Sequence, residues 1–232
     1  MTDLLRVLRT FALGREASPE ALTRLAAAAA WHTAAEGDVL WEEGARSERV
    51  LLITAGLVQI VRHDRGGDDT SLALFGPREL IGLTAVLADG RYPAAAMVVS
   101  ERATVLALPA AQVTSEAAAD LGFARSVNHA LIEHTRALHA KISMVTGGTV
   151  AQRLAVTFTH LAERFGDEDT DGATVIPLTL TRRMLAQLIG ARTETVVRTL
   201  TAWQRDGLLA TTGDGFRFRS PAALAALAEA AG

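Results

Sequence analysis

The hydrophobic and polar positions of the first half of the chain follow two successive patterns. Residues 2–11 have apolar positions at helical spacing, and Ser18-Pro19 opens a second helix that we expect to run to about Trp31, because proline suits the first helical position. From 37 to 109, short apolar runs alternate with glycine-containing turns, a pattern that predicts a sandwich or barrel-like roll. Strands are expected at 39–41, 50–54, 57–62, 71–75, 80–83, 95–99 and 104–108, with turns at 43–44, 55–56, 65–68 and 88–90.

A different pattern begins after Pro109. From about 115 to 145, Gly122 is the only glycine or proline, and apolar or packable residues recur in steps of three or four. This spacing predicts one long helix with a narrow seam, the geometry by which two helices pair in a coiled coil. The residues expected at a homodimer interface are Val127, Leu131, His134, Leu138, Ile142 and Val145. Glycines at 147–148 should end this helix, and a further helix is expected to end near Phe165, followed by the acidic loop GDEDTDGAT.

Two short helical patterns around a glycine follow, between residues 178 and 205. Thr181 can cap the first helix, Gly190 closes it with a left-handed residue, and the second begins near Arg192. The apolar positions of the two helices are Met184, Leu185, Leu188, Val196, Leu200 and Trp203. One helix that packs and a second that presents polar side chains are typical of a helix-turn-helix.

The end of this region adds a hairpin and a local positive charge. Residues 208–211, the turn 213–215 and the alternating 216–219 predict a β-hairpin, or wing. Seven arginines and three acidic residues lie between 172 and 219, whereas the whole chain carries a net charge of −3. A basic patch confined to one region is the pattern of a nucleic-acid-binding surface, and it favours this interpretation over a helical hairpin with a merely solvated face.

Composition excludes several classes of protein. The chain has 232 residues, 49% of them hydrophobic, and no apolar run of membrane-spanning length or signal-peptide cleavage pattern, so we expect a cytoplasmic protein without a membrane partner. Without cysteine there can be no disulfide and no thiolate-ligated metal. No nucleophile–base pair, paired-carboxylate site or phosphate-binding glycine loop stands out, so neither catalytic residues nor enzyme activity is predicted.

Three histidines, a residue type that binds metal ions, lie on the expected long helix. His129, His134 and His139 are five residues apart and therefore spiral around the helix without sharing a face, so no metal site is predicted. His134 lies in the seam and is interpreted as a packed interface residue. A pH switch or a haem ligand is the alternative.

The order of β-roll, long helix and winged helix-turn-helix resembles the Crp/Fnr family of bacterial transcription regulators. LWEEGARSERVLLITAGLVQIV is similar to the family's early β-roll, RELIGLTAVLADGRYPAAA to its cyclic-nucleotide cassette, and LTRRMLAQLIGARTETVVRTL to its recognition motif. The resemblance implies an α+β fold. A cyclic-nucleotide-binding-like β-roll with N-terminal helices is expected over 1–114, a dimerisation helix over 115–146, and a winged helix-turn-helix DNA-binding domain over 147–232.

Several residues depart from the cyclic-AMP-binding members of that family. Leu83 stands in place of the ribose-binding glutamate, and Pro93 and Ala94 replace the arginine–serine pair that holds the cyclic phosphate. Because a buried phosphate needs a cation or adequate donors, we expect no response to cyclic AMP and predict no cofactor. Arg91 is the alternative cation, although it is expected to face solvent. A small-molecule effector of unknown identity remains open, with a pocket formed by Leu83, Thr84, Tyr92, Pro93 and Leu138.

The resemblance also assigns roles to the second helix of the helix-turn-helix. Glu194 and Arg198 match the glutamate and arginine that the Crp and Fnr branches share, and they are expected to contact a G·C-containing TGA core, since a carboxylate accepts from cytosine and arginine donates twice to guanine. Arg182 and Arg183 are expected to contact phosphates. The full set of expected DNA contacts is Arg182, Arg183, Arg192, Thr193, Glu194, Val197 and Arg198.

Together these patterns predict a homodimeric, sequence-specific regulator that binds an inverted repeat in double-stranded DNA and has RNA polymerase as a further partner. Two alternatives stay open: a regulator that acts without any effector, and a haem-based gas sensor.

Overall fold

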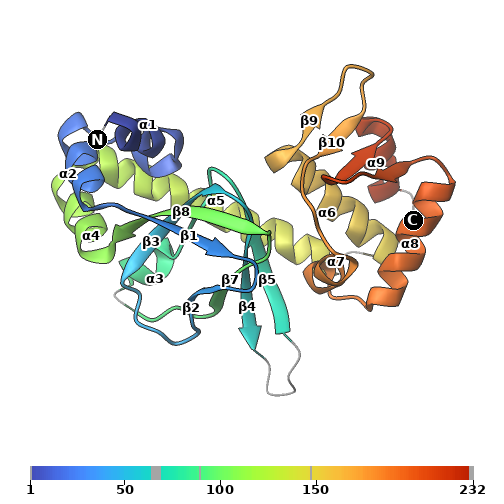
Figure 1. Cartoon of the computed structure of the whole chain (residues 1–232), viewed down its shortest axis with the longest axis horizontal. Helices are drawn as coiled ribbons and strands as arrows, with labels where there is room; N and C mark the ends of the chain where they lie inside the picture. Colours follow the sequence, from blue (N-terminus) through green and yellow to red (C-terminus); the bar gives the residue numbers. More distant parts are fainter. Residues whose placement is uncertain (1, 64–68, 89, 147, 230–232) are drawn as a thin grey trace. The chain divides into compact units, whose positions relative to one another are not determined.

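The computed structural model describes residues 2–63, 69–88, 90–146 and 148–229, and the chain divides into two compact units, Met1–Arg136 and Ala137–Gly232 (Figure 1). The mixture of helices and sheets agrees with the predicted α+β class. The expected turn at 65–68 lies outside the described residues. So do residue 89, in the expected turn at 88–90, and residue 147, in the expected helix break at 147–148.

The N-terminal helices begin as predicted, but the second is shorter. α1 spans Thr2–Thr10, a 3₁₀ turn spans Ala12–Gly14, and α2 spans Pro19–Ala28, where the Ser18 hydroxyl accepts a hydrogen bond from the Ala21 amide at 3.1 Å. The expectation that α2 reaches Trp31 is wrong. Strand β1, Ala30–Ala35, begins there and pairs antiparallel with β8 along its whole length, so sheet pairing overrides the helical preference of the alanines.

Two four-stranded sheets form the predicted β-roll, in the orders β1-β8-β3-β6 and β2-β7-β4-β5 (Figure 1). The expected strand at 80–83 ends at Ile81, because Gly82 adopts a φ of 86° and starts the short helix α3, Leu83–Leu87. The remaining strands are β2 Val39–Trp41, β3 Arg49–Ala55, β4 Val58–His63, β5 Asp69–Phe75, β6 Leu80–Ile81, β7 Ala95–Val98 and β8 Arg102–Pro109.

The two central strands of the first sheet, β3 and β8, are buried on both faces, whereas the edge strand β1 is exposed. On β3, Leu51 and Ile53 face the interior of the roll, whereas Leu52 faces a second core built from α1, α2, α4 and the start of α5. Strand β8 alternates in the same way, with Val105 inside the roll and Leu106 against the helices. This double burial explains why these strands are almost continuously apolar in the sequence.

The predicted single helix from about 115 is two helices. α4, Ala110–Ala119, is followed by α5, Leu121–Thr146, and the boundary between the two compact units falls within α5. The break occurs at Asp120, whose backbone is extended and whose Oδ1 accepts from the Phe123 amide at 2.6 Å. Gly122 permits this turn, since a Cβ there would lie 1.9 Å from the Glu16 carbonyl oxygen.

The second unit contains the helix-turn-helix and a four-stranded sheet of order β11-β12-β10-β9. The side chains of Phe158, Trp203, Phe216 and Phe218 form its aromatic core, with ring centroids 4.9 to 6.4 Å apart. Strands β9 and β10 and helix α9 were not predicted. The elements are α6 Val150–Phe165, β9 Asp167–Glu168, β10 Thr174–Ile176, α7 Arg182–Ile189, α8 Thr193–Arg205, β11 Leu209–Thr211, β12 Phe216–Phe218 and α9 Pro221–Glu229.

Of the helices that the structure describes, none combines the length and the apolar character that a bilayer crossing needs.

Candidate nucleic-acid interface

Local hydrogen bonds fix the turn between α7 and α8. The Thr181 hydroxyl accepts from the Met184 amide at 3.1 Å and caps α7, as predicted. Gly190 ends α7 in the left-handed conformation, with φ 62° and ψ 49°, and the Ala191 amide donates to the Ala186 carbonyl at 2.9 Å. The turn therefore redirects the chain within two residues, and α8 begins at Thr193, one residue after the predicted start.

α8 has one buried and one exposed face. Val196, Leu200 and Trp203 are buried at helical spacing, which fixes the helix on the aromatic core of its unit. Residues three or four positions apart lie on the same side of a helix, and those on the side opposite the buried residues are exposed. That exposed face carries Glu194, Val197, Arg198 and Thr201. Thr193 is half-buried in the first turn, and the N-cap residue Arg192 is exposed.

The exposed face presents unpaired charges. Within the part of the chain that the structure describes, the side chains of Arg183, Arg192, Glu194 and Arg198 form neither an ion pair nor a hydrogen bond. Val197, 43% exposed, adds an apolar side chain to this face, three residues from Glu194. A face with free donors, one free acceptor and a small apolar group has the chemistry that base edges in the major groove require.

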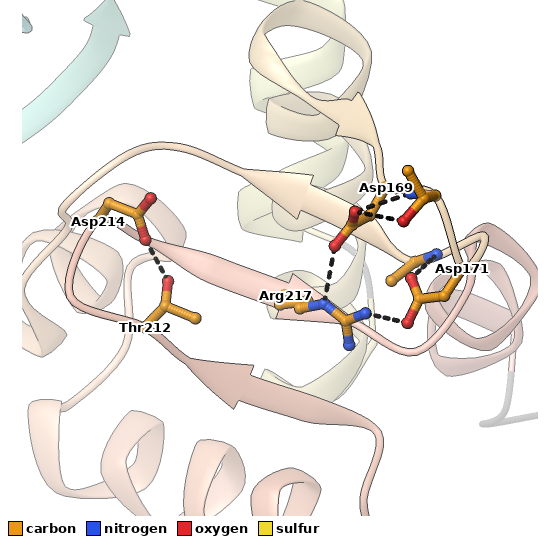
Figure 2. A network of polar contacts seen from close by, with 7 residues as sticks. Asp169, Asp171, Thr212, Asp214 and Arg217 are labelled. Carbon is orange, nitrogen blue, oxygen red and sulfur yellow. Dashed lines mark hydrogen bonds and ion pairs between the residues drawn. The ribbon is translucent and has the colours of Figure 1, made fainter.

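Two other arginines of the basic region are paired inside the unit. Arg217 on β12 donates from Nε to Asp169 Oδ2 at 3.5 Å and from Nη2 to Asp171 Oδ2, as Figure 2 shows. The Arg217 guanidinium holds the pKa of the Asp171 carboxyl below its usual range. Arg205 pairs with the adjacent Asp206 at 3.0 Å. The predicted local charge is therefore partly neutralised, because the acidic loop between β9 and β10 folds back onto the wing.

Arg182 also has a partner within the unit. Its Nη2 donates to Thr211 Oγ1 at 3.1 Å, and its guanidinium carbon lies 5.6 Å from the centroid of the Phe216 ring. Burial lowers the pKa of Arg182. The neighbouring Arg183 is exposed. The two arginines, which the sequence placed together as phosphate contacts, thus have different surroundings.

The expected dimer seam changes character along α5. Val127 is buried in the core of its own unit, and Leu131 packs partly against that core. His134 is half-buried, and burial lowers the pKa of its imidazole. Further along, Leu138 and Ile142 are 50% and 56% exposed. Val145 is half-buried, and its carbonyl accepts from Arg153 Nη1 at 3.1 Å.

The residues expected to line an effector pocket are distributed over different parts of the structure. Leu83 packs in the helical core, whereas Tyr92 packs inside the roll, and Leu138 belongs to the other compact unit. Thr84 and Pro93 are exposed. Leu83 and Tyr92 thus lie in different cores, and the effector pocket stays a prediction.

Arg91, the alternative cation for a phosphate, is exposed, and its Nη1 donates to the Gly44 carbonyl at 2.7 Å. A groove of about 300 Å³ does open on the roll, but it is formed by other residues. These are His32, Thr33, Ala34, Asp38, Val39, Leu40, Arg49, Leu51 and Val105. Among the described residues, no three His, Cys, Asp or Glu side chains are placed to hold a metal ion.

Two known domain families match the chain, one in its N-terminal half and one in its C-terminal half. The model of the cyclic nucleotide-binding domain matches residues 31–120, and that of the Crp-like helix-turn-helix domain matches residues 152–227. The CRP-like cAMP-activated global transcriptional regulator of Mycobacterium tuberculosis is 25% identical over 76% of this chain and 78% of its own length. The transcriptional activator protein FnrA of Stutzerimonas stutzeri is 24% identical over 83% and 78%.

Solved structures agree on the fold. FixK2 from Bradyrhizobium japonicum superposes with a TM-score of 0.76 at 20% identity, covering 88% of this chain and 99% of FixK2. A CRP-family transcriptional regulator from Thermus thermophilus gives a TM-score of 0.69 at 22% identity, covering 85% and 96%. Both domain matches, the curated relatives and the exposed face of α8 point to one conclusion. The chain belongs to the Crp/Fnr family of DNA-binding transcription regulators.

Proposed function

We propose that the protein is a homodimeric, sequence-specific regulator that binds an inverted repeat and does not respond to cyclic AMP. The observation that carries the proposal is the exposed face of α8, where Glu194, Val197 and Arg198 project from a helix whose other face is fixed by Trp203. RNA polymerase is the further partner that the family membership suggests, and the cytoplasm is the compartment in which such a regulator would act.

Base recognition follows from the chemistry of that face. The Arg198 guanidinium can donate twice to the O6 and N7 atoms of one guanine, and the Glu194 carboxylate can accept from the N4 amino group of a cytosine. Val197 can contact a thymine methyl group. These contacts fit a TGA-like half-site, and Thr193 lies at the start of the helix where flanking bases would be contacted.

Dimerisation is supported by the second half of α5. Leu138 and Ile142 are four residues apart, lie on one face of the helix and are about half exposed in the single chain. A second copy of the same helix would cover both side chains by the coiled-coil packing of residues in steps of three and four. Dimerisation brings two DNA-binding domains together, which matters because the half-sites of an operator lie about one turn of the DNA helix apart.

The absence of a cyclic-AMP response is supported by packing inside the roll. Trp41 and Tyr92 stack with ring centroids 4.1 Å apart and an interplanar angle of 11°. Trp41 Nε1 donates to the Ala94 carbonyl at 3.0 Å, and the Tyr92 hydroxyl donates to the Arg49 carbonyl at 2.7 Å. The two aromatic rings are therefore held in place by hydrogen bonds as well as by stacking.

This stack lies beside the start of α3, where the family's cassette would hold a phosphate. A Cβ on Gly82 would lie 3.3 Å from Tyr92 Cε1 and 3.4 Å from Trp41 Cη2. The rings thus fill the space next to the Gly82 backbone with apolar surface, which offers a phosphate no cation. This packing favours the effector-independent form of the regulator.

Selection of binding sites from random duplex DNA tests the proposal. We expect recovery of an inverted repeat with TGA-like half-sites, at an equal yield with and without cyclic AMP. Direct calorimetric titration with cyclic AMP should give no specific binding. A selected pool without an inverted repeat would contradict the DNA-reading part of the proposal, and micromolar binding of cyclic AMP would contradict the other part.

A further inference from the structure

A single hydroxyl group joins three elements of the DNA-binding unit. Thr211 is the last residue of β11, and its Oγ1 accepts from Arg182 Nη2 on α7 at 3.1 Å and from Gln204 Nε2 on α8 at 3.0 Å. The wing therefore leaves the body of the unit from a residue that is held by both helices of the helix-turn-helix.

We propose that Arg182 is a positioning residue for the wing, acting through Thr211 together with Gln204. The proposal rests on the proposed function, since a wing needs a fixed position only if it contacts DNA. It assigns to Arg182 a role different from the phosphate contact that its place in the sequence suggested, and it leaves that role to the exposed Arg183.

The wing is small, and one of its strands lies at the edge of the sheet. β11 and β12 have three residues each, and β12 also pairs with β10, whereas the edge strand β11 pairs with β12 alone. On β12, Phe216 and Phe218 are buried in the aromatic core and fix that strand. On β11, Leu209 is the only buried residue. The end of β11 that leads into the turn therefore depends on the polar contacts of Thr211.

The far side of the hairpin has separate restraints. Within the turn, the Thr212 hydroxyl donates to Asp214 Oδ1 at 2.7 Å, and Figure 2 shows this contact next to the Arg217 pair with the acidic loop. These contacts shape the turn and hold β12. Neither connects the hairpin to α7 or α8, the two helices against which the wing has to be aligned for both to contact one DNA duplex.

The surroundings of Arg182 fit a structural role. Its guanidinium faces the Phe216 ring and the neutral Thr211 hydroxyl, and burial lowers its pKa. A cation over an aromatic face gains from the ring quadrupole. The Arg182 side chain thus contacts both strands of the wing, Thr211 on β11 and Phe216 on β12. Arg183, the next residue, is exposed, and within the described residues its side chain has no partner.

The test compares Arg182→Ala and Thr211→Val with their double variant, using Thr211→Ser as the conservative control and Arg183→Ala as the neighbouring cation. In the free protein, we expect faster hydrogen exchange of the β11 and β12 amides in Arg182→Ala and Thr211→Val but not in Thr211→Ser or Arg183→Ala. Unchanged exchange in the first two variants would overturn the proposal, whatever happens on DNA.

Binding to the selected operator over a range of salt concentrations gives the second readout. Arg182→Ala and Thr211→Val should each weaken binding roughly tenfold, the loss expected for one hydrogen bond to a charged group, and the double variant should be no weaker than the singles. In these variants the dependence of the binding constant on salt concentration should be unchanged. In Arg183→Ala it should correspond to the release of about one counterion fewer.

A reduced salt slope in Arg182→Ala together with wild-type binding by Thr211→Val would make Arg182 a phosphate contact and overturn the proposal. If the wild-type protein binds no operator while the exchange results hold, the proposed function fails and the positioning role of Arg182 within the fold stands.

Discussion

A glutamate and an arginine four residues apart on a helix ordinarily attract each other, yet Glu194 and Arg198 form no ion pair within the described residues. Each is left with its full hydrogen-bonding capacity, and the exposed Val197 lies next to Glu194 on the same face. The arrangement suits two contacts to different bases better than it suits helix stability. We therefore expect base recognition by this face to depend on the shape of the donor groups as well as on their charge.

Replacement of Arg198 by lysine separates shape from charge. Arg198→Lys keeps the cation but loses the planar fork that can donate twice to one guanine. We expect the preference for guanine at that base pair to fall by about 1–3 kcal/mol while the salt dependence of binding stays the same. Competition binding with single-base operator variants measures both quantities, and a preserved guanine preference would remove Arg198 from direct base contact.

Gly190 is a second position where one residue decides local geometry. Its φ of 62° is in the left-handed region, and a Cβ would meet no atom within 4 Å, so a substitution there costs backbone strain alone. Gly190→Ala should lower the free energy of unfolding by about 1–2 kcal/mol. Gly213→Ala is the matched control, since a Cβ there also meets open space but without a positive φ. Equal urea midpoints for the two variants would contradict this account of the turn.

At the scale of the elements, an ion pair between Arg24 and Glu116 connects helices α2 and α4, and its glutamate is buried. The Glu116 side chain is buried and accepts from Arg24 Nε at 2.7 Å and Nη2 at 2.8 Å, and from Gln112 Nε2 at 2.7 Å. The hydrogen bonds from Arg24 are the main cause that lowers the pKa of Glu116 below its usual value of 4.5, against the opposing effect of burial. The pair thereby makes the first unit sensitive to acid.

The pH dependence follows from that lowered pKa. The unfolded chain takes up the proton first, so the stabilisation is fully present above pH 4.5 and is lost as the pH falls through the lower pKa of the folded state. In Arg24→Met the folded-state pKa of Glu116 should rise toward its unfolded value, so the protein should be less stable at neutral pH and should lose less of its stability on acidification. Arg6→Met, which removes an exposed pair with Asp3, is the control and should leave the acid limb unchanged. Thermal denaturation followed from neutral to acid pH measures the difference, and identical acid limbs would contradict it.

The exposed half of α5 carries the prediction about assembly. Leu138→Asp should place one carboxylate from each protomer in the apolar seam and so favour monomers. Light scattering should then report 24.5 kDa in place of twice that mass, with loss of operator binding. Ile132→Asp is the matched control, because Ile132 is 49% exposed on the same helix but lies outside the predicted seam. A Leu138→Asp protein that remains dimeric would remove α5 from its proposed role.

For the molecule as a whole, the features that were predicted best are those that depend on residues close together in the chain. The Thr181 cap, the left-handed Gly190 and the two faces of α8 each depend on residues within one or two turns of helix, and all were visible in the sequence. The order of roll, long helix and winged helix-turn-helix followed from changes of hydrophobic period, because each element class has a period of its own. The family resemblance added the fold of the complete chain.

Features that depend on distant residues were not predictable in the same way. Strand β1 was not predicted, and the preceding helix was expected to reach Trp31, since the pairing of β1 with β8 lies more than sixty residues away in the chain and leaves no local trace. The ion pair of Arg217 with the acidic loop escaped the charge count for the same reason, and so did the contact of Arg182 with Thr211. The separation of Leu83 and Tyr92 into different cores was likewise not visible in the sequence.

The central claim, that α8 contacts bases through its exposed face, is tested most directly by base-resolved binding of the wild-type protein and Glu194→Ala. We measure the affinity of both proteins for every single-base substitution in a half-site of the selected operator. The account predicts that Glu194→Ala loses about 1–3 kcal/mol of preference at one G·C pair of the TGA-like core and keeps its preferences elsewhere. An unchanged base profile, or a uniform loss at all positions, would contradict it.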